Sequence, residues 1–508
     1  MSDFLYSSDE IRAIETAHAK KYPQDSLMQR AGAAVAAIAV TLLKNKRGAN
    51  ILVLVGPGNN GGDAWVAAAA LIKAGHRMTL LEPGQHKQTD SAAKKAFTAV
   101  RKAKAPVATK FPVAAKFDLI IDGLFGIGLK RAPTGVFADA IARANANADA
   151  HHTPILAIDV PSGLVADTGV ALGATIQADF TVTFLGAKPG LYTADGVDVA
   201  GEIHVDSLGT TTTKSTHGEL LNRANIAPLI PKRRNSSHKG SFGNVGIVGG
   251  ATGMIGAAVL AARAALHMGP GKVFAGFNAS DAPGFDTINP EIMVRPADEL
   301  VTDTTLTAMA IGMGLGGDKS ARRLLKAALA RALPTVIDAD ALTIIAANPA
   351  IHAAHQAKMA ENPHQCLSLI FTPHPGEAAR LLEVAVNEIQ SDRVRAAKSI
   401  AVKFNAVTVL KGAGTVIATP DGRYWINTTG NPGMASGGMG DALSGMIASF
   451  LAQGMNALDA AKLGVYLHGA AADECLAHGM APHGLTASEV IFEARTLLNA
   501  GLHAHDHD

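Results

Sequence analysis

The chain has 508 residues, of which 48% are hydrophobic and 17% are charged, and this balance excludes a disordered chain or a coiled coil. At about 100–200 residues per domain, its length predicts more than one domain. The 45 basic residues nearly cancel the 43 acidic ones and leave a formal net charge of +2, so no global field attracts nucleic acid or a membrane surface. We therefore expect small molecules and further copies of the chain as partners, the latter as a homo-oligomer.

Three further patterns indicate the cellular setting. Cys366 and Cys475 share no motif spacing, which argues against a disulfide framework or a zinc site. The N-terminal segment lacks the basic and apolar regions of a signal peptide, and no uncharged apolar run of spanning length occurs without several glycines. A cytoplasmic location is expected.

The first half alternates strands with helices. Two helices are expected within 8–43, followed by a buried strand at 50–55 (NILVLV), the turn GPGNNGGD and a helix. The glycine spacing is not that of the dinucleotide fingerprint, so we interpret the turn as a polar site at the end of a parallel strand. Further strands are expected at 78–81, 117–122 and 154–159, with a helix at 91–101 and a mixed strand region over 178–205.

Polar side chains gather where these strands end. Asp122 and Asp159 terminate two strands, and Asn60, Asp63 and Ser162 stand in the turns. Hard oxygen donors at the carboxyl edge of a parallel sheet suit a cation or acid–base chemistry. Ordinary turn chemistry explains each carboxylate equally well, and the residues alone leave both interpretations open.

Residues 207–237 change character and predict a boundary near 215, dividing the chain into domains 1–214 and 215–508. The basic cluster PKRRNSSHKGS favours a solvated linker over a site for anions. Strands are then expected at 244–248, 272–276, 310–312, 334–338, 369–372 and 406–410, and the last helices over 460–468 and 488–498. The alternation predicts two parallel-sheet α/β domains with helices on both faces.

The stretch 430–450, GNPGMASGGMGDALSGMIASF, is a glycine-rich loop that opens a helix. Unpaired backbone N–H groups and the helix dipole stabilise an anion at such a junction. Asp441 stands there, either as a helix cap or as a functional carboxylate. Gly-Met-Gly-Asp resembles the anion-hole motif of the ribokinase-like fold, in which the aspartate is the base towards a substrate hydroxyl. His374 at a strand end faces the same cleft or serves the turn.

The whole set resembles one family. GPGNNGGD, Asp122, LFGIGL, DVPSG, GGATGMIGAA, TPHPGE, KGAGT and NPGMASGGMGD occur in this order in the bifunctional NAD(P)H-hydrate repair enzymes. The resemblance implies a Rossmann-like NAD(P)H-hydrate epimerase domain followed by a ribokinase-like dehydratase domain. It further implies that the R and S forms of hydrated NADH or NADPH (NADHX, NADPHX) are interconverted, and that the S form is dehydrated with ADP, yielding AMP and phosphate. K⁺ in the first half and Mg²⁺ in the second are the implied cofactors.

The resemblance also implies roles for particular residues. In the first half, the substrate would contact Asn59, Asn60, Gly61, Gly62, Asp63, Gly126, Ile127, Gly128, Leu129, Lys130, Arg131, Ala132 and the catalytic Asp159, and K⁺ would contact Asn60, Asp122 and Ser162. In the second half, the substrate would contact Ala257, Gly314, His374 and the catalytic base Asp441, and the nucleotide would contact Lys411, Gly412, Ala413, Gly414, Thr415 and Gly440. Lys130 and Arg131 would meet the substrate's diphosphate.

Two other functions remain open on the sequence. One is a ribokinase-like, ATP-dependent kinase of a small alcohol or vitamin precursor with a non-catalytic N-terminal module. The other is a first half that only binds or scaffolds, although Asn60, Asp63, Asp122 and Asp159 would then have no use together. The HAHDHD tail is expected to be a solvated terminus rather than a metal site.

Overall fold

The computed structural model describes residues 3–44, 46–84, 90–112, 116–210, 217–331, 333–360 and 369–502, with the backbone alone for 357–360. The chain divides into two compact units, Met1–Glu219 and Leu220–Asp508. The expected boundary near 215 falls in 211–216, outside the described residues, as do Cys366 and the histidine-rich tail, so the domain limits 1–214 and 215–508 stay a prediction. Within the described part of the chain, no helix is both long and apolar enough to cross a membrane.

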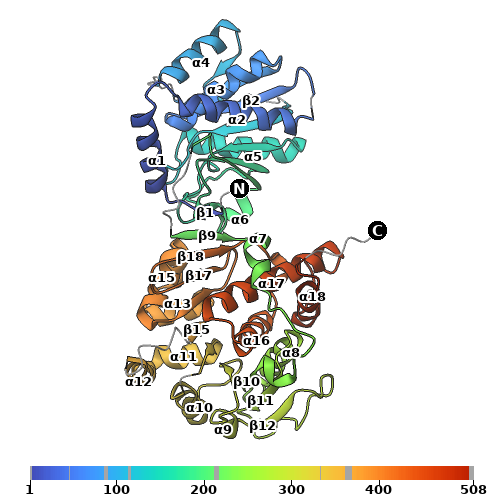
Figure 1. Ribbon diagram of the computed structural model, residues 1–508. Coiled ribbons are helices and arrows are strands. Elements are labelled where there is room, and N and C mark those ends of the chain that lie inside the picture. Colours follow the sequence, from blue (N-terminus) through green and yellow to red (C-terminus); the bar gives the residue numbers. More distant parts are fainter. Residues whose placement is uncertain are drawn as a thin grey trace. The chain divides into compact units, whose positions relative to one another are not determined.

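The first unit is built on a seven-stranded, wholly parallel sheet of order β4-β3-β2-β5-β6-β7-β8 (Figure 1). Its elements are β1 (Phe4–Leu5), α1 (Ser8–Lys21), α2 (Leu27–Leu42), β2 (Asn50–Val55), α3 (Asn59–Lys73), β3 (Arg77–Leu81), α4 (Ser91–Lys102), β4 (Val107–Ala108), β5 (Leu119–Gly123), α5 (Val136–His151), β6 (Ile155–Ile158), β7 (Phe180–Phe184), η1 (Pro189–Leu191), α6 (Gly196–Val199) and β8 (Glu202–Asp206).

Two apolar layers enclose this sheet. One packs α2, α3 and α4 against alternate side chains of the strands, and the other packs α5 against the remaining side chains. The run NILVLV of β2 is therefore buried on both faces, as its unbroken apolar sequence predicts. The expectation of a mixed strand region over 178–205 is wrong, because β7 and β8 continue the parallel pairing.

The second unit contains β9 (Gly218–Leu221, which spans the division), α7 (Arg223–Ile226), η2 (Ala227–Leu229), η3 (Lys239–Phe242), β10 (Asn244–Gly249), α8 (Ile255–His267), β11 (Lys272–Phe277), β12 (Met293–Pro296), α9 (Ala297–Leu300), β13 (Ala308–Ile311), α10 (Lys319–Leu329), β14 (Thr335–Ile337), α11 (Ala339–Ala347), α12 (Pro349–Ala360), β15 (Leu369–Phe371), α13 (Pro375–Leu382), α14 (Val386–Ser391), α15 (Arg393–Phe404), β16 (Val407–Leu410), β17 (Val416–Ala418), β18 (Tyr424–Asn427), η4 (Pro432–Met434), α16 (Met439–Ala452), α17 (Ala457–Ala477) and α18 (Ala487–Asn499).

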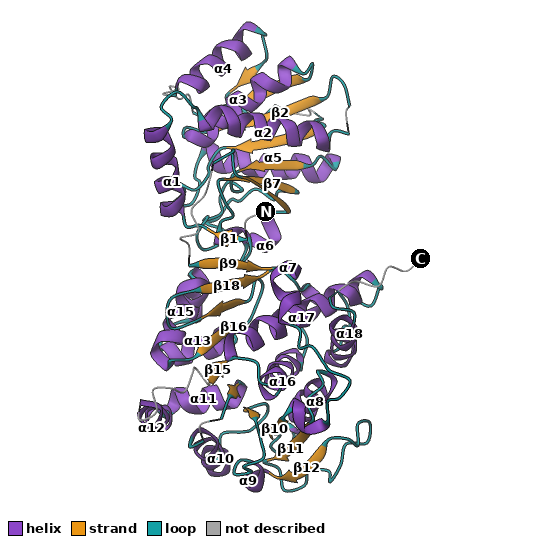
Figure 2. Ribbon diagram, in the orientation of Figure 1, coloured by secondary structure: helices purple, strands orange, loops and turns teal. Residues whose placement is uncertain are grey.

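Its sheet has the order β9-β18-β17-β16-β15-β14-β13-β10-β11-β12 (Figure 2). The strands from β10 to β16 pair in parallel, whereas β17 and β18 form an antiparallel extension beside β16. The expected parallel α/β architecture is confirmed for the main part of this sheet. The β17–β18 hairpin departs from it because its short connections leave no room for a crossover helix.

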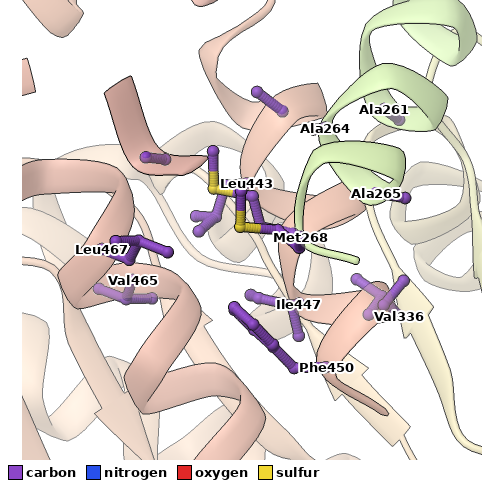
Figure 3. Close-up of a cluster of buried hydrophobic side chains, with 14 of the residues drawn as sticks. Ala261, Ala264, Ala265, Met268, Val336, Leu443, Ile447, Phe450, Val465 and Leu467 are labelled. Carbon is purple, nitrogen blue, oxygen red and sulfur yellow. The ribbon is translucent and has the colours of Figure 1, made fainter. Parts of the chain in front are cut away.

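Small residues let two helices of the second unit approach closely. In α16, a Cβ on Gly445 would lie 2.0 Å from the backbone oxygen of Ala261 in α8, a distance that no side chain could occupy. Alanines of α8 and the apolar side chains Leu443, Ile447 and Phe450 of α16 form one buried cluster together with α17 (Figure 3). This packing fixes the helix that carries Asp441 at its start.

Candidate active sites

In the first unit, the glycine-rich turn joins β2 to α3 and packs against neighbouring backbone. A Cβ on Gly61 would lie 1.9 Å from the backbone oxygen of Gly56, and a Cβ on Gly56 would lie 1.7 Å from that of Leu124. These glycines are therefore needed for close backbone packing. The turn buries Asn60 and Asp63 at the start of α3 and leaves Asn59 exposed.

The three predicted cation ligands meet around the backbone of Phe125. The hydroxyl of Ser162 lies 2.7 Å from Oδ1 of Asp122, and the Ser162 N–H donates to Oδ2 at 2.8 Å. The Phe125 N–H donates to the Ser162 hydroxyl at 2.8 Å, and Asn60 Nδ2 donates to the Phe125 oxygen at 3.0 Å. Burial raises the pKa of Asp122 to about 6, although the hydrogen bonds from Ser162 and Leu124 oppose the shift.

Asp159 lies at the end of β6 in a left-handed backbone conformation, with φ of 65°. Its Oδ1 accepts a hydrogen bond from Lys188 Nζ at 2.6 Å. A Cβ on Gly126 would lie 3.2 Å from Asp159 Oδ2 and 3.3 Å from Asn60 Oδ1, so these two oxygens and the 126–132 loop border one small space. The structure thereby brings together predicted residues from three separate turns.

Further acidic groups surround Asp159. Burial, followed by the charges of Asp159, Glu15 and Asp90, raises the pKa of Asp63 well above its usual range. Burial and the charge of Asp159 also raise the pKa of Glu15 in α1, against the opposing effect of Lys188 and Arg12. Like charges in one buried site disfavour one another's ionisation, so both Asp63 and Glu15 are harder to ionise here than in water.

The 126–132 loop extends from this space to the surface. Its Ile127 oxygen accepts a hydrogen bond from Arg12 of α1 at 3.4 Å. The side chains of Lys130 and Arg131 are exposed and form no ion pair with any described residue. They are thus free to meet an anionic group of a ligand.

In the second unit, Asp441 lies in the first turn of α16, whose N-cap is Gly438 in a left-handed conformation. Among the described residues Asp441 accepts no hydrogen bond, so the helix-cap interpretation of this residue is wrong. Burial and the charge of Asp338 raise its pKa to about 6, and the charge of Lys411 acts in the opposite direction. A carboxylate with this pKa is suited to act as a general base near neutral pH.

Lys411 follows β16, and its ammonium group lies beside two acidic side chains. Its Nζ lies 2.8 Å from Asp338 Oδ1 and 4.0 Å from Glu377 Oε2. Burial alone would lower the pKa of Lys411, but the charges of Asp338 and Glu377 outweigh burial and raise it. A Cβ on Gly440 would lie 3.1 Å from this Nζ, so the KGAGT turn and the glycine loop are neighbours.

Other predicted positions have different surroundings. His374 is the N-cap of α13: its Nδ1 accepts from the Gly376 N–H at 3.0 Å, and its Nε2 lies 3.2 Å from Glu377 Oε1. Its side chain is half exposed, so serving the turn does not prevent contact with a ligand. Gly314, with φ of 59°, lies against Ala257, since a Cβ at Gly314 would be 3.3 Å from the Ala257 Cβ. The structure therefore pairs the loop after β13 with the first turn of α8.

Several residues at these sites were missed by the sequence reasoning. They are Glu15 and Lys188 in the first unit, and Asp338, Glu377 and His468 in the second. The strand expected at 334–338 ends at Asp338, and this position was the available signal. His468 is buried in α17, and its Nε2 has no hydrogen-bond partner in the described part of the chain; burial and the charge of Lys411 lower its pKa to about 4. Nothing in its local sequence distinguishes it from a core residue.

Two α/β units, each with acidic groups gathered at the carboxyl ends of parallel strands, define a two-domain enzyme of small-molecule metabolism. Residues 24–190 match the family model described as YjeF-related protein N-terminus, and residues 245–493 match that of NAD(P)H-hydrate dehydratase. The chain is 37% identical to the bifunctional NAD(P)H-hydrate repair enzyme Nnr of Coxiella burnetii, covering 97% of this chain and 99% of the relative. It is also 37% identical to the Escherichia coli protein of that name, covering 95% and 91%. The chain belongs to the family of bifunctional NAD(P)H-hydrate repair enzymes.

One solved structure is similar to the second unit. The ADP/ATP-dependent NAD(P)H-hydrate dehydratase of Bacillus subtilis, co-crystallised with ATP and Mg²⁺, is 31% identical with a TM-score of 0.48, covering 56% of this chain and 98% of its own. The family matches in both halves confirm the resemblance inferred from the motifs. They do not favour a small-alcohol kinase with a non-catalytic N-terminal module.

Proposed function

We propose that this chain repairs hydrated NADH and NADPH in two steps carried by its two units. The Met1–Glu219 unit interconverts the R and S epimers of the hydrate. The Leu220–Asp508 unit transfers a phosphoryl group from ADP to the hydroxyl of the S epimer and eliminates phosphate, which leaves NAD(P)H and AMP. The observation that carries this proposal is Asp441, a carboxylate without a hydrogen-bonding partner among the described residues, at the start of a helix opened by glycines.

In the dehydratase unit, Asp441 would accept the proton of the substrate hydroxyl as its oxygen attacks the phosphorus. The N–H groups at the start of α16 would bind the transferring phosphoryl group. The KGAGT turn, Lys411 to Thr415, and Gly440 would hold the nucleotide, while Ala257, Gly314 and His374 would border the hydrate. Phosphorylation of the hydroxyl supplies the leaving group for the elimination.

The donor set of this unit fits Mg²⁺ held jointly with nucleotide phosphates. The described residues contain no cluster of three potential protein ligands, and Mg²⁺ at phosphoryl-transfer sites commonly uses only one or two carboxylates. Asp340 would supply one, because its Oδ2 accepts from the Gly316 N–H at 2.8 Å and its Oδ1 accepts no hydrogen bond from a described residue. When bound, the ion would neutralise charge on the phosphates.

In the epimerase unit, the hydrate would lie against Asn59 to Asp63, the 126–132 loop and the catalytic Asp159. Lys130 and Arg131 would bind its diphosphate. Asn60, Asp122 and Ser162 would hold K⁺, because Ser162 is bonded to the Asp122 carboxylate and the side-chain amide of Asn60 is bonded to the adjacent Phe125 carbonyl, so that oxygen-bearing side chains from three turns lie in one region. Homo-oligomer formation and a cytoplasmic location belong to the same proposal, and light scattering that gives the monomer mass would remove the first.

Recovery of reduced-nicotinamide absorbance from chemically hydrated NADH tests the two steps together. With ADP, the unmodified chain should restore the whole R and S mixture. With Asp159→Asn, the recovery of absorbance should stop when the S epimer is exhausted. Asp441→Asn should exchange the epimers without restoring absorbance. No recovery with ADP or ATP would reject the repair function and favour the alcohol kinase.

A further inference from the structure

We propose that Lys188 is a positioning residue of the epimerase site, holding one oxygen of Asp159 so that the other faces the substrate. The inference rests on the proposed placement of epimerisation at Asp159 and names a residue that acts through it. Lys188 follows β7 in the turn Gly-Ala-Lys-Pro-Gly, which by sequence alone is an ordinary connection.

The ammonium group of Lys188 is fully engaged. Its side chain is 0% exposed, and Nζ donates to Asp159 Oδ1 at 2.6 Å, to Thr183 Oγ1 at 2.7 Å and to the Phe184 oxygen at 2.7 Å. An ammonium group has three protons, and these three acceptors use all of them. Lys188 therefore has no proton left for a substrate, and any contribution to the reaction must pass through Asp159.

Asp159 is held on one side only. Besides Lys188, its Oδ1 accepts from the Thr183 hydroxyl at 3.2 Å and from the Phe184 N–H at 3.4 Å. Its Oδ2 accepts no hydrogen bond from a described residue and borders the space beside Gly126 and Asn60. The carboxylate plane is thus set by β7 and Lys188, and its free oxygen points to the proposed substrate position.

The left-handed backbone at Asp159 makes this support necessary. A non-glycine residue at φ of 65° is disfavoured and persists where surrounding contacts determine it. The Lys188 contact joins that residue to β7, a rigid strand of the sheet. Without the ammonium group, Asp159 would lose its shortest hydrogen bond and its only buried cationic partner among the described residues.

Lys188 also balances the charge of the site. Asp159 stands near two further carboxyl groups, Glu15 of α1 and Asp63 of α3, and one buried ammonium group compensates one negative charge. Lys188 is bonded to Asp159 and to neither of the others, so the compensated charge belongs to Asp159. The arrangement pairs one carboxyl group with the buried ammonium group, while burial and neighbouring negative charge raise the pKa of the other two.

The test is Lys188→Met in the full-length chain, a change that keeps a stem of the same length and removes the ammonium group. Epimer exchange without ADP should lose about 100-fold in kcat with KM altered less than about threefold, because misplacement of a reacting group affects the chemical step more than binding. Dehydration of the pure S epimer with ADP, measured in the same sample, reports on the second unit. Lys73→Met, at an exposed lysine of α3, is the matched control and should not alter exchange.

Rescue distinguishes positioning from a purely structural role. In Lys188→Ala, added methylammonium should restore part of the epimer exchange. The melting temperature of the first unit of this variant should be the same with and without methylammonium. Exchange by Lys188→Met within threefold of the unmodified rate would overturn the proposal. A folded Lys188→Ala that methylammonium does not restore would also overturn it.

If Lys188→Met does not fold, Thr183→Val provides a second test because it removes one acceptor of Lys188. This variant should lower kcat about 10-fold, and full activity would refute the inference. Full exchange by Asp159→Asn would instead reject the site itself.

Discussion

The pH dependence of dehydration provides a direct test of Asp441 as the base. Because a base must be ionised, activity should be present above the pKa and lost as the pH falls through it. With a pKa of about 6, roughly one tenth of the carboxyl is ionised at pH 5, whereas a carboxyl at 3.8 would remain about nine tenths ionised there. We therefore expect kcat/KM for the S epimer to fall about tenfold between pH 7 and pH 5.

The substrates have phosphate groups that titrate in the same range, so the profile needs a variant that moves only the protein group. Asp338→Asn removes a negative charge that raises the pKa of Asp441. The acidic limb of the profile, where kcat/KM falls with pH, should therefore shift to lower pH. Ser444→Ala removes the hydrogen bond to Asp338 Oδ2 at 2.7 Å but keeps the carboxylate, so its limb should stay near the original position.

The assay is the initial rate of AMP formation, which does not depend on the acid stability of the reduced cofactor. Thermal melting at each pH shows that the variants remain folded. A limb that stays in place in Asp338→Asn would assign the titration to the substrates. A flat profile down to pH 5 would reject the reasoning about Asp441.

Three further predictions concern the first unit. Ser162→Ala removes the hydroxyl between Asp122 and Phe125 and should cost about 1–3 kcal/mol of stability and abolish any K⁺-dependent rise in melting temperature; an undiminished K⁺ effect relative to Na⁺ would contradict the cation site. Gly61→Ala should impair folding of this unit because its Cβ meets backbone at 1.9 Å, whereas Gly58→Ala, with no atom within 4 Å, should be tolerated; equal melting temperatures would show that the turn adapts. Replacing Lys130 and Arg131 with alanine should raise KM for epimer exchange and weaken its salt dependence with kcat little changed, and an unaltered KM would remove the diphosphate contact.

The sequence predicted the parts of the sites that follow from strand ends. Asp122, Asp159 and Ser162 terminate or follow neighbouring parallel strands, and the carboxyl ends of such strands meet at one edge of the sheet. Their proximity therefore followed from the alternation of elements alone. The family motifs added the roles proposed for these residues but not their hydrogen bonds.

The missed residues depend on tertiary packing. Lys188 is distinctive only because its turn folds inward against Asp159, and no periodicity in Gly-Ala-Lys-Pro-Gly indicates that direction. Glu15 lies on α1, whose capping box and surface pattern predict the helix but not what its partly buried face meets. Asp441 shows the opposite case: its position suggested a cap, but Gly438 occupies that position and leaves the carboxylate free.

The contact between Gly445 of α16 and the backbone of Ala261 in α8 restricts how the dehydratase unit can respond to its ligands. Because a Cβ on Gly445 would lie only 2.0 Å from the Ala261 oxygen, the two helix backbones touch there, and a sliding movement would bring larger residues into this contact. Rearrangement on nucleotide binding should therefore be confined to the loops that precede and face α16. In hydrogen exchange, we expect amides of α16 to remain protected with and without ADP, while protection changes in 411–415 and 430–438.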